Sequence, residues 1–532
     1  MSYLLLFTTV VVFLFQNIYV SAQSTWVRMY GGSNQDIAAS MIMAKDGSFI
    51  ATGSTYSNDG DFNVLNKGQD DITFLKFDVV GNFIVKKTYG GNSADFGTSI
   101  TNGVAGEYII AGNTFSNDGD FLGMQKGGMD GFAMKLDNSG TILWKTVIGG
   151  TSSDYVNSVF RIENGGYLIA GNTASNDGDF AGLQKGQDDI FIIKLSEDGT
   201  IEWRKTYGGV SNETCTSIAK TTDGGFVLTG YTSSNSGDFA GMNKGNEDIF
   251  VMKIDANGSM LWAKTYGGSG IDRGASITIT LDGNYLLTGL FFSNDGDFPA
   301  MNKGDADMFI AKIDGNGTLL WNKGFGGSAL DYGNHVTITQ NNDYIISGST
   351  KSAENIGAIR GKEDIILLKI SNNGEVLWSK RYGGNEIDRA VTVLAGDQSQ
   401  LMVYGYSASN DADFESQNKG LFDVFLMKLD SNGILTNPSD INHFNEYALN
   451  LSVYPNPCSD MSVISFSVET PSRIKVELLN SLGQTLEVMS DDFFERGIYQ
   501  ASLNTSNIPS GIYSVRMQSA SNTVRIPLVI VK

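Results

Sequence analysis

Residues 149–207 read GGTSSDYVNSVFRIENGGYLIAGNTASNDGDFAGLQKGQDDIFIIKLSEDGTIEWRKTY, and this stretch decides the fold because the chain repeats it. Its β-branched and aromatic runs are bounded by Gly, Asn and Asp turns and occupy residues 155–162, 167–173, 189–195 and 200–207. Such runs are typical of strands joined by hairpins, so we predict four strands per copy. The copies follow in five steps of 59 residues and a last step of 57, marked by Gly-Gly pairs at Gly31, Gly90, Gly149, Gly208, Gly267, Gly326 and Gly383.

The two ends of the repeat predict how the copies close on one another. Units of this size bury their apolar faces only by stacking, and four antiparallel strands repeated radially form a β-propeller. Trp26 stands five residues before Gly31, as Trp144 stands before Gly149, yet no first three strands precede it. We therefore predict an all-β, seven-bladed β-propeller whose N-terminal strand, around residues 26–29, completes the last blade and removes exposed edges. This strand order and closure resemble those of WD40 propellers, without their Trp-Asp dipeptide.

Composition and the N-terminus restrict the classes of partner and the compartment. The 532 residues carry a net charge of −21, which argues against nucleic acid as a partner. The two cysteines, Cys215 and Cys458, fall in different predicted domains, which excludes a disulfide framework. An apolar run at residues 4–15 leads to Val20-Ser21-Ala22 and predicts a signal peptide over residues 1–22. No Lys or Arg precedes that run, so a retained membrane anchor is the alternative.

The C-terminal residues have a different pattern from the repeat. We place the propeller at residues 23–437, a linker at 438–450 and a second, β-sandwich domain at 451–532. This last domain contains Tyr-Pro-Asn-Pro at 454–457, a Ser-Leu-Gly-Gln turn at 481–484, Gly-Ile-Tyr at 511–513 and a terminal Lys532. These elements, in this order, closely resemble the C-terminal sorting domain of type IX (Por) secretion cargo. The resemblance implies transport by the type IX machinery to the medium or the outer cell surface, with no membrane span after signal cleavage.

A repeated acidic loop offers candidate metal ligands. Most copies carry Ser-Asn-Asp-Gly-Asp-Phe, or a close variant, between the predicted second and third strands. Two acids one residue apart on a Gly-rich loop can bind calcium, whereas the same side chains can accept hydrogen bonds from loop N–H groups in Asx-turns. Repetition in nearly every copy favours the structural role, and calcium is the alternative cofactor. The candidate calcium ligands are Asp59, Asp61, Asp118, Asp120, Asp177, Asp179, Asp295, Asp297, Asp411 and Asp413.

The residue that follows the acid after each Gly-Gly pair varies where its neighbours do not. If these side chains surround one mouth of the channel, aromatics and arginines there can stack on a sugar or bind a carboxylate. The candidate ligand-binding residues are Phe96, Tyr155, Arg273, Tyr332 and Arg389. His335 replaces a serine found in five copies and, with Tyr332 and Arg389, supplies weak catalytic candidates. A hydrogen-bonded structural histidine is the favoured interpretation.

These patterns predict a secreted or cell-surface propeller that acts as a binding or adhesion module for carbohydrate or another surface ligand. Near-identical copies favour binding, because an active site usually makes some copies diverge sharply. Only the sixth copy does so, at residues 351–362. A carbohydrate-active enzyme, either a polysaccharide lyase or a glycoside hydrolase, is the first alternative, and a structural surface protein is the second.

Overall fold

The computed structural model describes residues 25–63, 65–163, 165–354, 359–396, 400–415, 417–435, 450–454, 458–468, 472–480, 483–494, 497–519 and 523–532. The predicted signal peptide and residues 438–449 of the predicted linker lie outside these ranges, as do residues 455–457 and 481–482 of the predicted sorting motifs. The chain divides into one compact unit, Thr25–Leu435, and a second that contains Thr436–Lys532. The two units are described separately.

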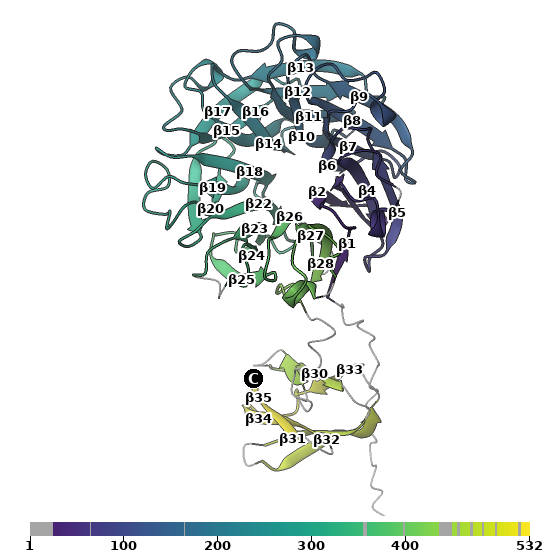
Figure 1. Cartoon of the computed structure of the whole chain (residues 1–532). Coiled ribbons are helices and arrows are strands. Elements are labelled where there is room, and N and C mark those ends of the chain that lie inside the picture. The colour runs from purple at the N-terminus through teal and green to yellow at the C-terminus, as the bar shows by residue number, and fades with distance from the viewer. Residues whose placement is uncertain are drawn as a thin grey trace, which may run out of the picture. The chain divides into compact units, whose positions relative to one another are not determined.

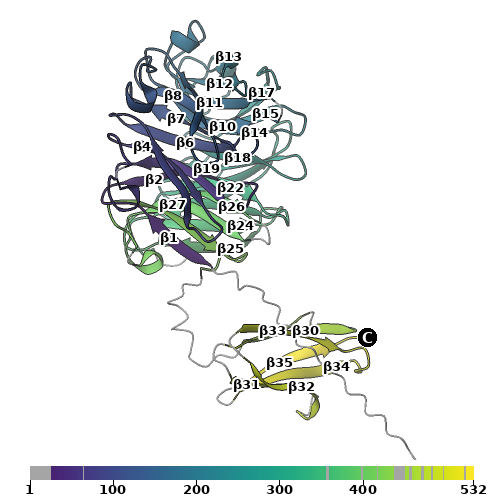
Figure 2. The same ribbon diagram turned by 90° about the vertical axis from the view of Figure 1, so that its right-hand side faces the viewer.

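The described residues of Thr25–Leu435 form seven four-stranded antiparallel sheets around a central opening (Figure 1), and Figure 2 shows them from the side. We number the sheets 1 to 7 in the chain order of their innermost strands. Within each sheet, the strands are given from the one nearest the opening outward. Sheets 1 to 3 are β2 (Asp36–Met43), β3 (Phe49–Thr55), β4 (Asp71–Phe77) and β5 (Phe83–Tyr89); β6 (Asp95–Asn102), β7 (Tyr108–Thr114), β8 (Asp130–Leu136) and β9 (Ile142–Ile148); and β10 (Asp154–Arg161), β11 (Tyr167–Thr173), β12 (Asp189–Leu195) and β13 (Ile201–Tyr207).

Sheets 4 to 7 repeat this order. They are β14 (Glu213–Lys220), β15 (Phe226–Thr232), β16 (Asp248–Ile254) and β17 (Met260–Tyr266); β18 (Asp272–Ile279), β19 (Tyr285–Phe291), β20 (Asp307–Ile313) and β21 (Leu319–Phe325); β22 (Asp331–Ile338), β23 (Tyr344–Thr350), β24 (Asp364–Ile370) and β25 (Val376–Tyr382); and β26 (Asp388–Ala395), β27 (Leu401–Ser407), β28 (Asp423–Leu429) and β1 (Trp26–Tyr30). The arrangement is that of a β-propeller, which confirms the predicted all-β class.

The N-terminal strand completes the seventh sheet, as the ends of the repeat predicted. β1 pairs antiparallel with β28, and the register runs from Trp26 opposite Lys428 to Tyr30 opposite Val424. The first and last strands of the unit are thereby held in one sheet, and β28 is paired on both sides, with β1 and with β27.

The tryptophan five residues before the Gly-Gly pair joins neighbouring sheets. The Trp144 indole N–H donates to the carbonyl of Glu197 at 2.9 Å, in the β12–β13 hairpin of the next sheet. Its ring lies so close to Gly199, where φ is +83°, that a Cβ atom there would be 2.6 Å from the ring. Trp26 lies equally close to Gly81 of sheet 1. The repeated tryptophan therefore explains both the glycine of the next hairpin and the place of β1 in the closure.

Packing between sheets explains the apolar middle strands. All seven residues of β4 and of β8 are buried, because both faces of each sheet are covered by a neighbour. The Asp-Phe of the acidic loop ends a short 3-10 turn, and its phenylalanine is fully buried; Phe121 lies 5.2 Å from Phe132 between ring centroids. These turns are η1 (Gly60–Phe62), η2 (Gly119–Phe121), η3 (Gly178–Phe180), η4 (Gly237–Phe239) and η6 (Ala412–Phe414).

The C-terminal unit has two sheets, among its described residues, that enclose a separate core. The first sheet orders β29 (Asn450–Tyr454), β30 (Met461–Val468) and β33 (Gly497–Asn504). The second orders β32 (Thr485–Phe494), β31 (Ser472–Leu479), β34 (Gly511–Gln518) and β35 (Thr523–Ile530). Buried Ile464, Phe466, Val476, Val515 and Leu528 lie in one apolar cluster. Cys458 belongs to this cluster and Cys215 to the propeller, and both are free thiols.

Among the described residues, two connections that most other junctions have are missing between sheets 5 and 6. Tyr266 at the end of sheet 4 donates its hydroxyl to the carbonyl of Gly317 at 2.5 Å, whereas Phe325 occupies this position at the end of sheet 5. The loop lysine of sheet 5, Lys303, contacts the carbonyl of Gly326 at 3.3 Å, while its counterpart Lys244 forms an ion pair with the next loop. Among the described residues, junction 5–6 therefore lacks both the tyrosine hydroxyl bond and the lysine–aspartate ion pair that junction 4–5 has.

We expect Phe325→Tyr to raise the free energy of unfolding by about 1 kcal/mol, because the added hydroxyl would supply the missing hydrogen bond. Tyr266→Phe is the matched opposite change and is expected to lower it by a similar amount. Denaturant unfolding of both variants measures the two effects. If Phe325→Tyr left the free energy of unfolding unchanged or lowered it, the missing hydroxyl bond would not be what weakens this junction.

Candidate functional site

The acids predicted as calcium ligands accept hydrogen bonds from backbone N–H groups. These N–H groups lie in the segment that begins with the Gly-Gly pair and leads into the first strand of the same sheet. Asp177 Oδ1 accepts a hydrogen bond from the N–H of Thr151 at 2.8 Å, and Asp179 Oδ2 accepts one from the N–H of Gly149 at 3.0 Å. Lys126, from the preceding sheet's loop, forms an ion pair with Asp179 at 2.5 Å. The other loop acids make equivalent contacts: Asp59, Asp61, Asp118, Asp120, Asp295, Asp297, Asp411 and Asp413.

Two further acids lie close in space to each Gly-Gly pair. One begins the strand that follows the pair, and the other begins the third strand of the preceding sheet. Asp154 accepts hydrogen bonds from Thr173, from Ser175 and from the N–H of Gly150. Asp130 Oδ2 accepts from the N–H of Lys126, while its buried Oδ1 has no hydrogen-bond partner among the described residues. Burial raises the pKa of Asp130 to about 6. Across the part of the chain that the structure describes, no three His, Cys, Asp or Glu side chains are placed to hold a metal ion.

We expect EDTA to leave the thermal unfolding midpoint of the protein unchanged, because the loop carboxylates already accept hydrogen bonds from the backbone. Calorimetry in EDTA and in millimolar CaCl₂ measures the difference. A calcium-induced rise of several degrees that Asp177→Asn reduces would contradict the structural role and restore calcium as the cofactor.

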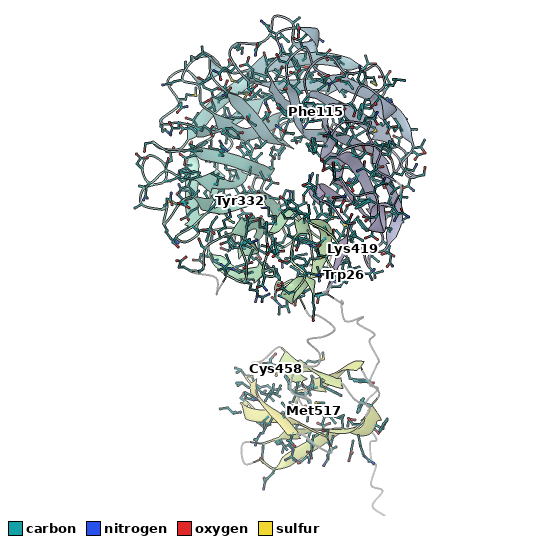
Figure 3. The ribbon with its side chains drawn as sticks, in the orientation of Figure 1. Trp26, Phe115, Tyr332, Lys419, Cys458 and Met517 are labelled. Atoms are coloured by element: carbon teal, nitrogen blue, oxygen red, sulfur yellow. The ribbon has the colours of Figure 1, made fainter. Side chains whose placement is uncertain are left out.

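The predicted mouth residues occupy equivalent positions at one end of the sheets. Each is the second residue of the strand nearest the opening, and each is half-buried. The residue after the second strand lies at the same end and is exposed at Tyr56 (44%), Phe115 (41%) and Phe292 (41%). Phe115 and Tyr332 lie on different sides of the central opening (Figure 3). We call this end the variable face, because it carries the positions that differ from copy to copy: Phe96, Tyr155, Arg273, Tyr332 and Arg389.

Tyr332 and Arg389 meet at a carboxylate that the sequence analysis did not single out. Glu363, directly before β24, has a fully buried side chain and accepts hydrogen bonds from Arg389 Nε at 2.6 Å and NH2 at 2.9 Å. The Tyr332 hydroxyl donates to the same carboxylate, and Lys351 Nζ lies 3.7 Å from it. Burial would raise the pKa of Glu363, but the hydrogen bonds and charges of these neighbours lower it. The carboxylate is therefore ionised and held in place.

A second arginine–glutamate pair of the same kind lies two copies earlier. Arg273 Nε contacts Glu247 at 2.5 Å, and its guanidinium lies 4.7 Å from the centre of the Tyr231 ring. Glu247 and Glu363 stand directly before the third-strand acid, where the other copies have residues as different as Asp70 and Phe422. This variation was the available signal for the glutamates. Phe96 and Tyr155 lie in sheets 2 and 3, away from both of these arginine–glutamate pairs.

His335 belongs to a different contact. It lies opposite Ser347 in β22, the strand of sheet 6 nearest the opening, and contacts the backbone of Val393, while its Nδ1 has no hydrogen-bond partner among the described residues. Burial lowers the pKa of His335 to about 4, so the imidazole is neutral near pH 7. Burial also raises the pKa of Tyr332. Neither group is set to exchange a proton near neutral pH, where general acid–base catalysis needs its pKa values.

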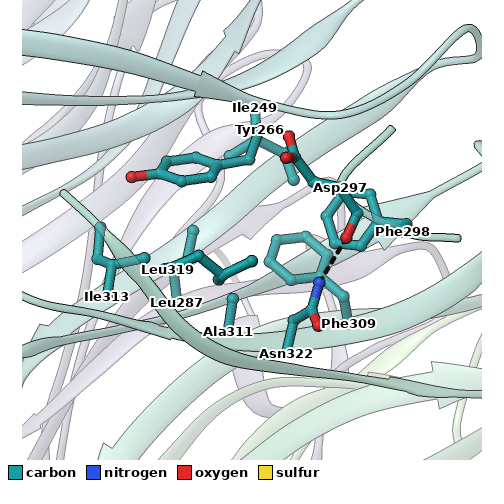
Figure 4. Close-up of a pocket in the computed structure, with 10 residues that line it drawn as sticks. All are labelled: Ile249, Tyr266, Leu287, Asp297, Phe298, Phe309, Ala311, Ile313, Leu319 and Asn322. Carbon is teal, nitrogen blue, oxygen red and sulfur yellow. Dashed lines mark hydrogen bonds between the residues drawn. The ribbon is translucent and has the colours of Figure 1, made fainter. Parts of the chain in front are cut away.

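Two cavities are lined by described residues, and none of the variable positions is among their lining residues. One of about 10 Å³ lies between sheets 4 and 5, where Asn322 donates to the carbonyl of Asp297 at 2.7 Å (Figure 4). It has room for about one water molecule and for no larger ligand. The other, of about 130 Å³, is lined by the hairpin residues Lys45, Asp46, Glu107 and Asn138. Those hairpins connect the strands at the opposite end of the sheets from Tyr332.

Residues 452–532 match the family described as the secretion system C-terminal sorting domain. The match confirms the predicted type IX cargo: the chain carries this sorting domain, and the protein is secreted or displayed on the cell surface. No helix among the described residues is long and apolar enough to cross a membrane.

The chain also has distant relatives among curated proteins. The chain is 23% identical over 305 residues to the regulatory protein FlaEY of Caulobacter vibrioides, covering 50% of this chain and 31% of that protein. It is 19% identical over 459 residues to the uncharacterized WD repeat-containing protein L264 of Acanthamoeba polyphaga mimivirus, covering 67% and 32%. The chain thus spans about a third of the length of these curated relatives.

Solved structures with a likeness to the chain are equally remote. A crystal structure of puromycin hydrolase has 11% identity and a TM-score of 0.42, covering 83% of this chain and 60% of that one. The cobalt-substituted ACO of Synechocystis has 10% identity and a TM-score of 0.35, covering 68% and 90%. The site is therefore interpreted from its own residues.

Proposed function

We propose that this secreted propeller is a binding or adhesion module that recognises carbohydrate or another surface ligand at the variable face. The proposal rests on the observation that the copies differ mainly at positions on this one face. Framework residues recur from copy to copy, whereas variation gathers in the second residue of the inner strand, the residue after the second strand and the residue before the third-strand acid. Exposed aromatics such as Phe115 and Phe292 stand among these positions and offer flat apolar surface for a sugar ring.

The chemistry of the same positions favours binding over catalysis. Glu363 is ionised and occupied by Arg389, and Tyr332 has a raised pKa. His335, the third of the weak catalytic candidates, contacts the backbone of Val393 instead of this cluster. An arrangement of paired charges and half-buried rings can hold a ligand without transferring a proton to it.

A glycan array probed with the secreted protein tests the proposal. We expect retained binding of at least one glycan class, with the polymer length unchanged after incubation. The double variant Phe115→Ala/Phe292→Ala should bind about thirtyfold more weakly, because stacking on each of the two aromatics contributes about 1 kcal/mol. Leu143→Ala is the matched control, since Leu143 is an exposed apolar residue of the outer strand β9.

Other outcomes would replace the proposal with one of its alternatives. New reducing ends or unsaturated-uronate absorbance would identify a carbohydrate-active enzyme. Failure to bind any glycan, protein or cell-surface fraction would favour a structural surface protein.

A further inference from the structure

The Glu363 cluster contains two cations for one carboxylate. Arg389 takes both oxygens of Glu363, and Lys351 Nζ lies 3.7 Å from one of them. Neighbouring cations are paired one to one: Lys362 with Glu386 and Arg360 with Asp413, each at 2.6 Å, and Arg381 with Asp364 at 3.8 Å. The cluster therefore has one positive charge in excess, on a chain whose net charge is −21.

The excess charge is accessible. The Lys351 side chain is 41% exposed and that of Arg389 is 34% exposed, whereas Glu363 beneath them is fully buried. At 3.7 Å, Lys351 Nζ is in ionic contact with Glu363 but beyond hydrogen-bond distance, so its three N–H donors are available to a ligand. An anionic group that approached from solvent would meet these donors before the carboxylate.

Aromatic rings extend from the cluster along the variable face. The guanidinium of Arg389 lies 6.0 Å from the ring centres of both Tyr332 and Tyr406 and donates to the Tyr406 hydroxyl at 3.1 Å. Tyr406 packs edge-on against Phe422 at 5.6 Å. A charged group next to a row of half-buried rings suits a ligand that is both anionic and flat-faced.

We propose that the Glu363 cluster is a subsite for an acidic saccharide, with Lys351 binding one carboxylate or sulfate group and the Tyr406–Phe422 rings contacting the sugar. This inference rests on the proposed function and deepens it. Glu363 acts as a positioning residue: it fixes Arg389, which in turn orients Tyr406. The Arg273–Glu247 pair has no such excess charge, because Ser233 occupies the place of Lys351 in that copy.

The test compares three probes on the secreted protein by calorimetric titration: oligogalacturonate, a sulfated dextran oligosaccharide and a neutral laminarin oligosaccharide. Lys351→Met should weaken binding of an anionic probe about tenfold, the effect of one charge-assisted hydrogen bond, and leave the neutral probe unaffected. Lys351→Arg should retain binding. Lys362→Met is the matched control, because it removes an exposed cation that already has a partner.

The outcomes separate this inference from the proposal beneath it. Equal affinity of wild type and Lys351→Met for both anionic probes would overturn the subsite, even if neutral glycans bind. Absence of binding to all three probes, together with no binding to any glycan on the array or to any protein or cell-surface fraction, would overturn the proposed function itself. A preference between the carboxylated and the sulfated probe identifies the anionic group. Unchanged melting of Lys351→Met excludes misfolding as the cause of any loss.

Discussion

Gly149→Ala is expected to destabilise the propeller by about 3 kcal/mol or more. A Cβ atom at this position would stand 2.0 Å from Asp130 Oδ1 and 3.0 Å from Asp154 Oδ2. Both carboxylates are fully buried at the start of their strands, so neither can move aside without breaking contacts with its own sheet. The methyl group must therefore push sheets 2 and 3 apart. Chemical denaturation followed by tryptophan fluorescence measures the loss.

A control and a double variant identify the cause. Gly315→Ala should change stability little, because a Cβ atom there meets nothing within 4 Å. Adding Asp130→Ala to Gly149→Ala removes the carboxylate that the methyl group strikes, so the double variant should lose less than the sum of the two single losses. Additive losses would mean that the close approach to Asp130 is not what excludes alanine.

The fold could be predicted because the features that specify it lie within one copy of the repeat. Hairpin turns and apolar runs indicate four strands, and the unmatched Trp26 indicates the closure that β1 provides. The role of the Gly-Gly pair could not be predicted in the same way. Gly149 and Gly150 lie outside the left-handed region, and they are glycines because the carboxylates of Asp130 and Asp154 approach the first closely and that of Asp177 approaches the second.

The candidate site was harder to predict, because its contacts join different copies. Arg389 and Glu363 are 26 residues apart, and only the placement of sheet 6 beside sheet 7 brings them together. Tyr332 and Arg389 could be selected as variable residues in an otherwise constant position. Lys351 begins the divergent segment 351–362 of the sixth copy, and Glu363 directly follows that segment. The excess positive charge of this cluster is visible only in the folded structure, where Lys351 and Arg389 both lie beside the single carboxylate of Glu363.

The repeated acids impose an electrostatic cost that leads to a prediction about pH. Asp71 and Asp423 each begin a third strand and have a buried Oδ1 without a hydrogen-bond partner among the described residues. Burial raises the pKa of both carboxyls to about 7, with neighbouring acids adding to the effect. The corresponding acids Asp130, Asp248 and Asp307 have pKa values of about 6 for the same reason.

We expect the propeller to be more stable near pH 5 than near pH 8. A carboxyl whose pKa is raised in the folded state binds its proton more tightly there than in the unfolded chain, where the pKa is about 4. The resulting stability is complete below about pH 4 and is lost as the pH rises through 6 and 7. Asp46, Asp223 and Asp282 have pKa values lowered to about 2, so their opposing loss of stability occurs only below about pH 4.

Calorimetry between pH 4.5 and 8 should therefore show a melting temperature that falls as the pH rises. Asp71→Asn tests the cause, because the amide oxygen can still accept the N–H of Lys67 while the side chain no longer titrates. This variant should gain stability relative to wild type at pH 8 and little at pH 5. A melting temperature that rises with pH, or an Asp71→Asn effect that is the same at both values, would show that these acids do not control the pH dependence. Because one such acid stands at every junction between sheets, the effect is multiplied around the propeller instead of being confined to a single site.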